Sequence, residues 1–169
     1  MYIAFHGNLE SIQQHIMNIK ALKPKNVAYL KEFFPSFKEA SADPKKQMLQ
    51  FLMLRNDFYK ANLEGNTIPY IISAGSIFSY YSRIFSQDQT LLDKARNVAR
   101  MLGINREPDL VIYLRDRDKA KRNPLRDYFY RHLGSWYGIN LKIVNRRDFV
   151  TDKKRIVKTI LEEMHNEHV

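Results

Sequence analysis

The amino-terminal residues have the layout of a phosphate-binding loop but lack the side chains that such a loop needs. The apolar run 2–5 predicts a strand, Gly7 and Asn8 predict a turn, and a helical pattern follows. In the motif G-x-x-x-x-G-K-S/T, backbone N–H groups and the lysine hold phosphates while the hydroxyl residue holds magnesium. Gly7 stands where the first glycine belongs, and the other three motif residues are replaced by Ile12, Gln13 and Gln14. Taken alone, this stretch is equally typical of an ordinary strand-turn-helix.

The chain is basic, and its charge is concentrated in one segment. It has 28 Lys and Arg against 18 Asp and Glu, a formal net charge of +10 and an isoelectric point near 9.7. Residues 115–158 contain 14 basic and 5 acidic residues, so they carry +9 of that charge. Such a segment favours anionic partners, whether nucleotides, nucleic acid or an acidic protein surface.

Length and composition predict a single domain, residues 1–169, with enough apolar residues for a core. No apolar run approaches the roughly 20 residues of a membrane span, and the amino terminus lacks the layout of a signal peptide. The absence of cysteine excludes disulfides and thiolate chemistry. We therefore expect an intracellular protein, in the cytoplasm or an organelle matrix, that is not secreted. The few histidines lie apart from carboxylate clusters, so we expect no metal site.

Five short apolar runs bounded by turn residues predict strands. They are residues 2–5, 26–30, 68–72, 110–114 and 141–144. Helical patterns begin at Asp43-Pro44, cover residues 88–102 up to Gly103, and begin again near Thr151. Near-continuous apolar strands are typical of a parallel sheet that is covered on both faces. The predicted fold class is therefore α/β: a three-layer α/β/α sandwich with a five-stranded parallel sheet and a ligand crevice at the carboxyl ends of its strands.

Several short matches occur in the same order as in the deoxynucleoside kinases, a branch of the P-loop kinases related to thymidylate kinases. They are Phe5-His6-Gly7-Asn8, residues 27–32, Asp43-Pro44-Lys45-Lys46 with Leu49-Gln50, residues 71–79, residues 108–114, the basic run after them, and residues 127–137. In that order they are similar to the family's first strand and turn, second strand, base-reading helix, acidic-Arg-Ser corner, fourth strand, lid, and the helix after the lid. The chain resembles the family over nearly its whole length, which implies a P-loop-kinase-like fold.

The departures from the family bear on activity. In a working P-loop kinase the loop lysine neutralises the transferred phosphoryl group and the hydroxyl beside it holds magnesium, which Gln13 and Gln14 do not provide. The β-branched Ile12 disfavours the backbone shape of an anion nest. At the corner after the third strand, the resemblance places Ala74 at the family's acidic residue and Gly75 at the arginine that grips the substrate's 5′ end. Two separate parts of the phosphate chemistry are therefore missing.

The resemblance also assigns candidate site residues. Glu32 matches the general base that takes the proton from the 5′ hydroxyl, and the alternative is a solvated acid at a strand end. Gln50 matches the base-reading glutamine, and the alternative is an amide packed beside a loop; Phe78 would line the nucleoside crevice or the core. The degenerate phosphate site would comprise Gly7, Asn8, Gln13, Arg115, Arg117, Lys121 and Arg122. For the lid cations, the alternative is a solvated charged loop.

We expect a catalytically degenerate deoxynucleoside-kinase-like protein that acts as a binding or structural (accessory) component, which favours a chain that is not an enzyme. One alternative is an atypical active nucleoside or nucleotide kinase, which would need ATP and Mg as cofactors. A second is a basic module that binds nucleic acid or an acidic protein. The implied partners are a nucleoside or nucleotide, or a larger protein or ribonucleoprotein assembly that contacts the 115–158 face. The aromatic helices are compatible with a homodimer.

Overall fold

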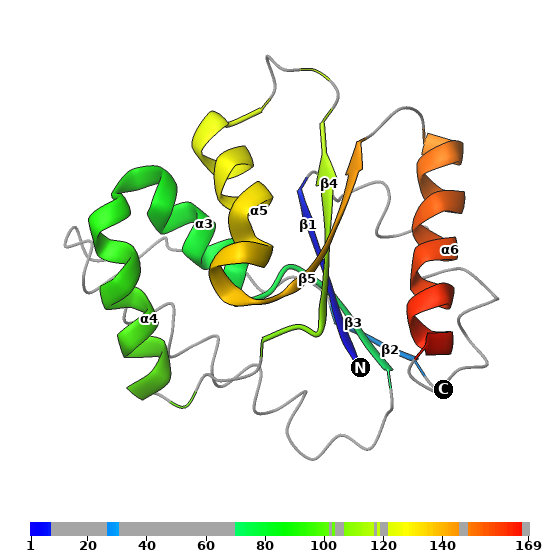
Figure 1. Ribbon diagram of the computed structural model, residues 1–169, viewed down its shortest axis with the longest axis horizontal. Coiled ribbons are helices and arrows are strands. Elements are labelled where there is room, and N and C mark those ends of the chain that lie inside the picture. The colour runs from blue at the N-terminus through cyan, green and yellow to red at the C-terminus, as the bar shows by residue number, and fades with distance from the viewer. Residues whose placement is uncertain are drawn as a thin grey trace.

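The computed structural model of the chain contains one sheet of five parallel strands with helices on both faces (Figure 1). It describes residues 1–7, 27–30, 70–101, 103, 107–116, 118, 122–145 and 149–166. The strands are β1 (Tyr2–Gly7), β2 (Val27–Leu30), β3 (Tyr70–Ala74), β4 (Leu110–Arg115) and β5 (Asn140–Asn145). Their order is β2-β3-β1-β4-β5, and all four neighbouring pairs are parallel. The predicted five-stranded parallel sheet is thus confirmed.

The helices of the described residues follow β3, β4 and β5. They are α3 (Ile77–Gln87), the short 3-10 helix η2 (Gln89–Leu91), α4 (Leu92–Met101), α5 (Pro124–Tyr137) and α6 (Phe149–Asn166). The helix expected over residues 88–102 is present as η2 followed directly by α4. Asp88 has an extended backbone that ends α3, and it caps the new helix because its carboxylate accepts a hydrogen bond from the Thr90 N–H at 2.9 Å. The helix expected at Asp43-Pro44 lies outside the described residues.

Three layers result from the direction of the crossovers. The chain passes from β3 to β4 and then to β5, in the same direction across the sheet, and right-handed crossovers then place both connections on one face. Accordingly α3 and α5 lie on one side of the sheet with α4 outside them, and α6 lies on the other side (Figure 1). The predicted α/β/α sandwich is confirmed. No helix among the described residues has the length and apolarity to cross a membrane.

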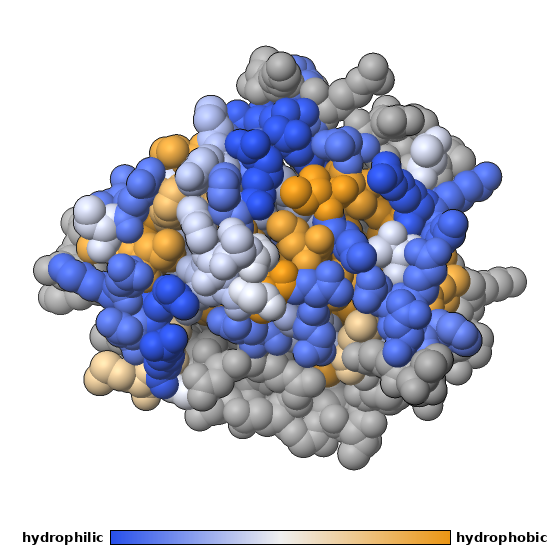
Figure 2. Space-filling view, in the orientation of Figure 1, coloured by the Kyte–Doolittle hydropathy of each residue, from blue (hydrophilic) through white to orange (hydrophobic). Residues whose placement is uncertain are grey.

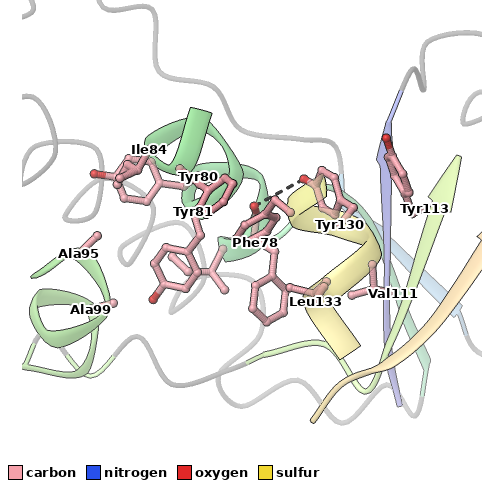
Figure 3. Close-up of a cluster of buried hydrophobic side chains, with 13 residues drawn as sticks. Phe78, Tyr80, Tyr81, Ile84, Ala95, Ala99, Val111, Tyr113, Tyr130 and Leu133 are labelled. Carbon is pink, nitrogen blue, oxygen red and sulfur yellow. Dashed lines mark hydrogen bonds between the residues drawn. The ribbon is translucent and has the colours of Figure 1, made fainter. Parts of the chain in front are cut away.

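Two apolar clusters hold the layers together. On the α6 side, Ile3 and Phe5 of β1 belong to a buried cluster with Ile156 and Ile160. On the other side, side chains from β4, α3, α4 and α5 form a second cluster that is rich in aromatic rings (Figure 3). Because successive residues of a strand point to opposite faces, β1 is buried on both faces and anchors the whole sheet.

Candidate functional site

The connections between strands lead to opposite sides of the central strand, and this defines where a ligand site is expected. Strands β2 and β3 lie on one side of β1, whereas β4 and β5 lie on the other. In open α/β sheets, ligands bind outside the carboxyl ends of the strands at such a topological switch point. Here those ends are formed by Gly7 of β1, Ala74 of β3 and Arg115 of β4.

Gly7 is required by a close backbone contact. It has a φ of +109°, and a Cβ at this position would collide with the carbonyl group of Leu114, its register partner in β4. The glycine therefore lets the ends of β1 and β4 approach each other. This packing reason for a glycine stands independently of any phosphate, and the phosphate-binding role of Gly7 stays a prediction.

The corner between β3 and α3 is fixed by backbone and serine hydrogen bonds. Gly75 has a φ of +77°, and its N–H donates to the carbonyl oxygen of Phe5 at 2.7 Å. Ser76 caps α3: its hydroxyl accepts from the Phe78 N–H, and the Ser79 hydroxyl accepts from the Ser76 N–H in a capping box. An arginine at position 75 would have to adopt a left-handed backbone, which L-residues with a Cβ disfavour.

Ala74, the neighbour of this glycine, has its side chain in the apolar core. It is 2% exposed and belongs to the cluster on the α6 side, together with Phe5 and Leu114. A carboxylate in that position would lose its hydration among apolar side chains. The corner as built thus suits the small residues that occupy it.

A buried histidine lies at the same edge. His6 is 1% exposed, and its Nε2 is hydrogen-bonded to the Ser76 hydroxyl at 2.9 Å. Its Nδ1 is within hydrogen-bond distance of the Tyr130 hydroxyl at 2.8 Å and of the Ser79 hydroxyl at 3.1 Å. This network joins the end of β1 to the first turn of α3 and to α5. Sequence reasoning placed His6 in the match to the family's first strand and turn and rejected a metal site at the histidines, but it did not predict this network.

A second polar cluster is centred on a buried carboxylate. Asp127 accepts two hydrogen bonds from the Arg115 guanidinium, Nε to Oδ1 at 2.8 Å and Nη2 to Oδ2 at 2.9 Å. The Tyr113 hydroxyl donates to Oδ1 at 3.2 Å, and Arg131 Nε lies 3.3 Å from Oδ2. The stacked rings of Tyr113 and Tyr130, with centroids 4.6 Å apart, connect this cluster to the histidine network.

The electrostatics of this cluster follow from its partners. Burial opposes ionisation of Asp127, yet the hydrogen bonds and charge of Arg115, with help from Tyr113 and Arg131, outweigh it and hold the pKa of Asp127 below its usual value. Burial, followed by the charge of Asp127, raises the pKa of the Tyr113 hydroxyl, which stays protonated. The Arg115 side chain is 24% exposed, so its charge is largely committed to Asp127.

Four of the predicted site residues lie in the described part of the chain. Gly7 and Arg115 are placed at the switch-point edge as above, and Arg122 donates from Nε to the carbonyl oxygen of Asp116. Phe78 is fully buried, and its ring lies beside that of Tyr81 (Figure 3). It meets the rings of Tyr81 and Tyr137 edge-on. Its role in nucleoside binding stays a prediction. Six predicted residues lie outside the described part: Asn8, Gln13, Glu32, Gln50, Arg117 and Lys121.

Metal coordination finds no support in this region. Within the residues that the structure describes, no group of three or more His, Cys, Asp or Glu side chains is arranged to hold a metal ion. Asp127, one of the acids near the switch point, has its oxygens bound by arginine and tyrosine donors.

Comparison with known proteins identifies the fold. No family model and no curated protein matches the sequence. Among solved structures, the chain is similar to thymidylate kinase from Ehrlichia chaffeensis, with a TM-score of 0.69 and 16% sequence identity over 95% of this chain and 98% of that chain. At this identity the likeness shows the fold alone. The chain has the P-loop kinase fold, which the sequence resemblance implied.

Proposed function

We propose that this protein is a catalytically degenerate relative of the deoxynucleoside kinases that acts as a binding or structural component. The observation that carries the proposal is the corner after β3. There Ala74 is packed into the apolar core and Gly75 has a left-handed backbone, at the two positions that the resemblance matches to an acid and an arginine. A corner built in this way favours close packing over contact with a phosphorylated substrate.

The missing groups are those on which phosphoryl transfer depends. Catalysis of this reaction is mostly positioning and electrostatic stabilisation by a loop lysine, magnesium and arginines. Loss of one preorganised donor typically costs about 2.7 to 4 kcal/mol of transition-state stabilisation, or roughly 10² to 10³ in rate. The sequence has Gln13 in place of the lysine and Gln14 in place of the magnesium-binding hydroxyl residue, in addition to the changes at the corner. Even with strong non-additivity, little transfer is expected to remain.

The polar groups near the switch point add support, because they bind one another. His6 is enclosed by hydroxyls of α3 and α5, and Arg115 is bound in a bidentate pair with Asp127. Each contact stabilises the fold without an external ligand. This arrangement is expected of a kinase scaffold in which the polar groups at the carboxyl ends of the strands stabilise the fold.

The test is a coupled phosphotransfer assay with ATP and magnesium across the deoxynucleosides and their monophosphates. The proposal predicts rates no higher than those of a sample without protein. Turnover that Glu32→Gln abolishes would defeat it, because Glu32 is the residue that the resemblance assigns as general base. The matched control is Glu162→Gln, which changes an exposed acid of α6 and leaves any true activity intact.

The alternative of an atypical active kinase draws on one observation. Arg115 ends β4 at the switch-point edge, and Asp127 holds its guanidinium in a fixed orientation, as a phosphate-binding arginine requires. An active enzyme would be stabilised by ATP and magnesium, by about 2.7 kcal/mol at 100 times the dissociation constant. That corresponds to a rise in melting temperature of roughly 5 to 11 °C for a domain of this size. No rise at millimolar ATP would eliminate this alternative.

A further inference from the structure

Helix α5 carries a row of large side chains on its outer side. Leu125, Tyr128 and Trp136 are 41%, 43% and 40% exposed, and His132, between the last two, is partly exposed. Their spacings of three and four residues place them along one face of the helix. Figure 2 shows pale side chains of intermediate hydropathy over α5, with strongly hydrophilic ones beyond its N-terminal end. We name these four residues the α5 row.

The α5 row is unusual for the part of the chain that the structure describes. The other large hydrophobic side chain with comparable exposure there is Met101, at the end of α4. Scattered exposed apolar residues are ordinary, whereas contiguous ones mark an interaction surface. At 1.5 Å per residue the row is roughly 16 Å long. A row with i, i+3, i+7 and i+11 spacing matches the way in which one amphipathic helix lies against another.

The charges of α5 select the partner. Its exposed charged side chains are Arg126 and Arg131, while its acid, Asp127, is 8% exposed and bound to Arg115 and Arg131. Two copies of the chain related by a two-fold axis would bring these arginines towards their own equivalents. An acidic partner would instead be complementary to them.

The aromatic rings of the row disfavour a nucleic acid. Tyr128 lies nearly parallel to Phe85 of α3, at 8° with centroids 6.2 Å apart, and its centroid is 4.1 Å from that of His132. His132 in turn stacks on Trp136 at 25°. His132 therefore lies against both Tyr128 and Trp136 and covers part of one face of each ring, whereas base stacking needs an open face. The uneven surface that the ring edges and the aliphatic Leu125 form is better matched by the branched side chains of a protein helix.

We propose that the α5 row is the docking surface for an acidic amphipathic helix of another protein, with apolar side chains seated on the row and carboxylates beside Arg126 and Arg131. The proposal rests on the proposed role as a binding component and names its partner class. Its test involves no phosphotransfer, so the docking proposal and the loss of catalysis can each fail without the other.

The single tryptophan of the chain, Trp136, provides the signal. The ligand is a synthetic helical peptide of about 18 residues with leucines every three or four positions, glutamates on both flanks and no tryptophan. A second peptide has the same leucines with lysine in place of every glutamate. The acidic peptide is expected to shift the Trp136 emission to shorter wavelength in a saturable titration, and to bind more weakly as salt is raised.

Two variants locate the contact. Leu125→Glu places a negative charge in the row and is expected to weaken the acidic peptide about tenfold or more. Met101→Glu changes an apolar side chain that is 86% exposed outside the row, and it should leave the affinity unchanged. Both positions are exposed, so both variants are expected to fold, which circular dichroism verifies.

Four results would overturn the proposal. They are equal binding of the lysine peptide, no response of Trp136 to the acidic peptide, a saturable response to single-stranded polyuridine in place of the peptide, and sedimentation of the chain as a dimer that Leu125→Glu dissociates. The last two would assign the α5 row to a nucleic acid or to a second copy of the chain.

Discussion

Replacing Asp127 by asparagine tests whether the carboxylate organises the polar cluster between β4 and α5. The substitution keeps the size of the side chain and one acceptor oxygen, but it removes the negative charge. Arg115 would lose one half of its bidentate pair, whose two bonds are 2.8 and 2.9 Å long, and Arg131 would lose its nearest acid.

The expected cost follows from the burial of the pair. Breaking a buried ion pair by removing one partner costs about 3 to 5 kcal/mol, because a charge is left without compensation. Arg115 is 24% exposed, and water can solvate part of its charge. We therefore expect Asp127→Asn to lower the free energy of unfolding by about 2 to 3 kcal/mol, which is below the fully buried case. The melting temperature should fall by roughly 4 to 12 °C.

The assay is urea unfolding followed by the fluorescence of Trp136, with Glu162→Gln as the control. Glu162 is paired with Lys158 at 3.6 Å in an exposed i,i+4 contact, so its loss should cost at most about 0.5 kcal/mol. If Asp127→Asn costs no more than this control, the ion pair does not stabilise the fold as its geometry indicates.

The pH dependence gives an independent test of the same pair. Because Arg115 outweighs burial and keeps the pKa of Asp127 below its usual value near 3.9, the folded state binds fewer protons at this group in the acid range than the unfolded state. Its contribution is present above the unfolded pKa and is lost as pH falls through the folded pKa. The stability difference between wild type and Asp127→Asn should be constant from about pH 5 to 7 and shrink below about pH 4. A difference that grows on acidification contradicts this linkage.

Two further changes test the contacts at the end of β1. Gly7→Ala should cost about 2 to 4 kcal/mol in urea unfolding for two reasons. The new Cβ would collide with the Leu114 carbonyl, and the backbone has a positive φ that alanine disfavours. Gly103 also has a positive φ, +69°, but a Cβ there would have no atom within 4 Å, so Gly103→Ala should cost only about 1 to 2 kcal/mol. Equal costs for Gly7→Ala and Gly103→Ala would refute the steric argument. His6→Ala removes the buried hydrogen bonds of the imidazole to Ser76 and Tyr130 and leaves a cavity, so it should cost about 2 to 4 kcal/mol in thermal unfolding. Exposed His165→Ala should be within about 0.5 kcal/mol of wild type. A His6→Ala variant as stable as His165→Ala would mean that the network contributes nothing.

The sheet was predictable because its strands carry their own signals. Residues 110–114 are continuously apolar and follow a proline, and the structure has β4 at Leu110–Arg115. The order of the strands, β2-β3-β1-β4-β5, was not predicted, because no local pattern specifies which strands pair. Residue alternation places His6 on the same face of β1 as Ala4, but the sequence does not specify which side chains it meets there.

The polar networks were not predictable, because their members are distant in sequence. His6 and Tyr130 are 124 residues apart, and Arg115 and Asp127 are 12 apart across an element boundary. Only the tertiary packing of α5 on the sheet brings these groups together. Local patterns therefore identified neither pair.

The exposed apolar face of α5 could not be predicted from the sequence for a different reason. The helix has large side chains on both faces, with Phe129, Tyr130 and Leu133 buried while Leu125 and Trp136 are exposed. Hydrophobic periodicity separates an apolar face from a polar one, and it does not separate two apolar faces. Burial in the folded chain was needed to distinguish them.

We propose that this P-loop-kinase scaffold has lost phosphoryl transfer. The most direct test is transfer of the γ-phosphate of labelled ATP to a pool of deoxynucleosides and deoxynucleoside monophosphates, with wild type and Glu32→Gln measured side by side. We expect both to release no more labelled product than a sample without protein. Product that the wild type forms and Glu32→Gln does not would contradict it.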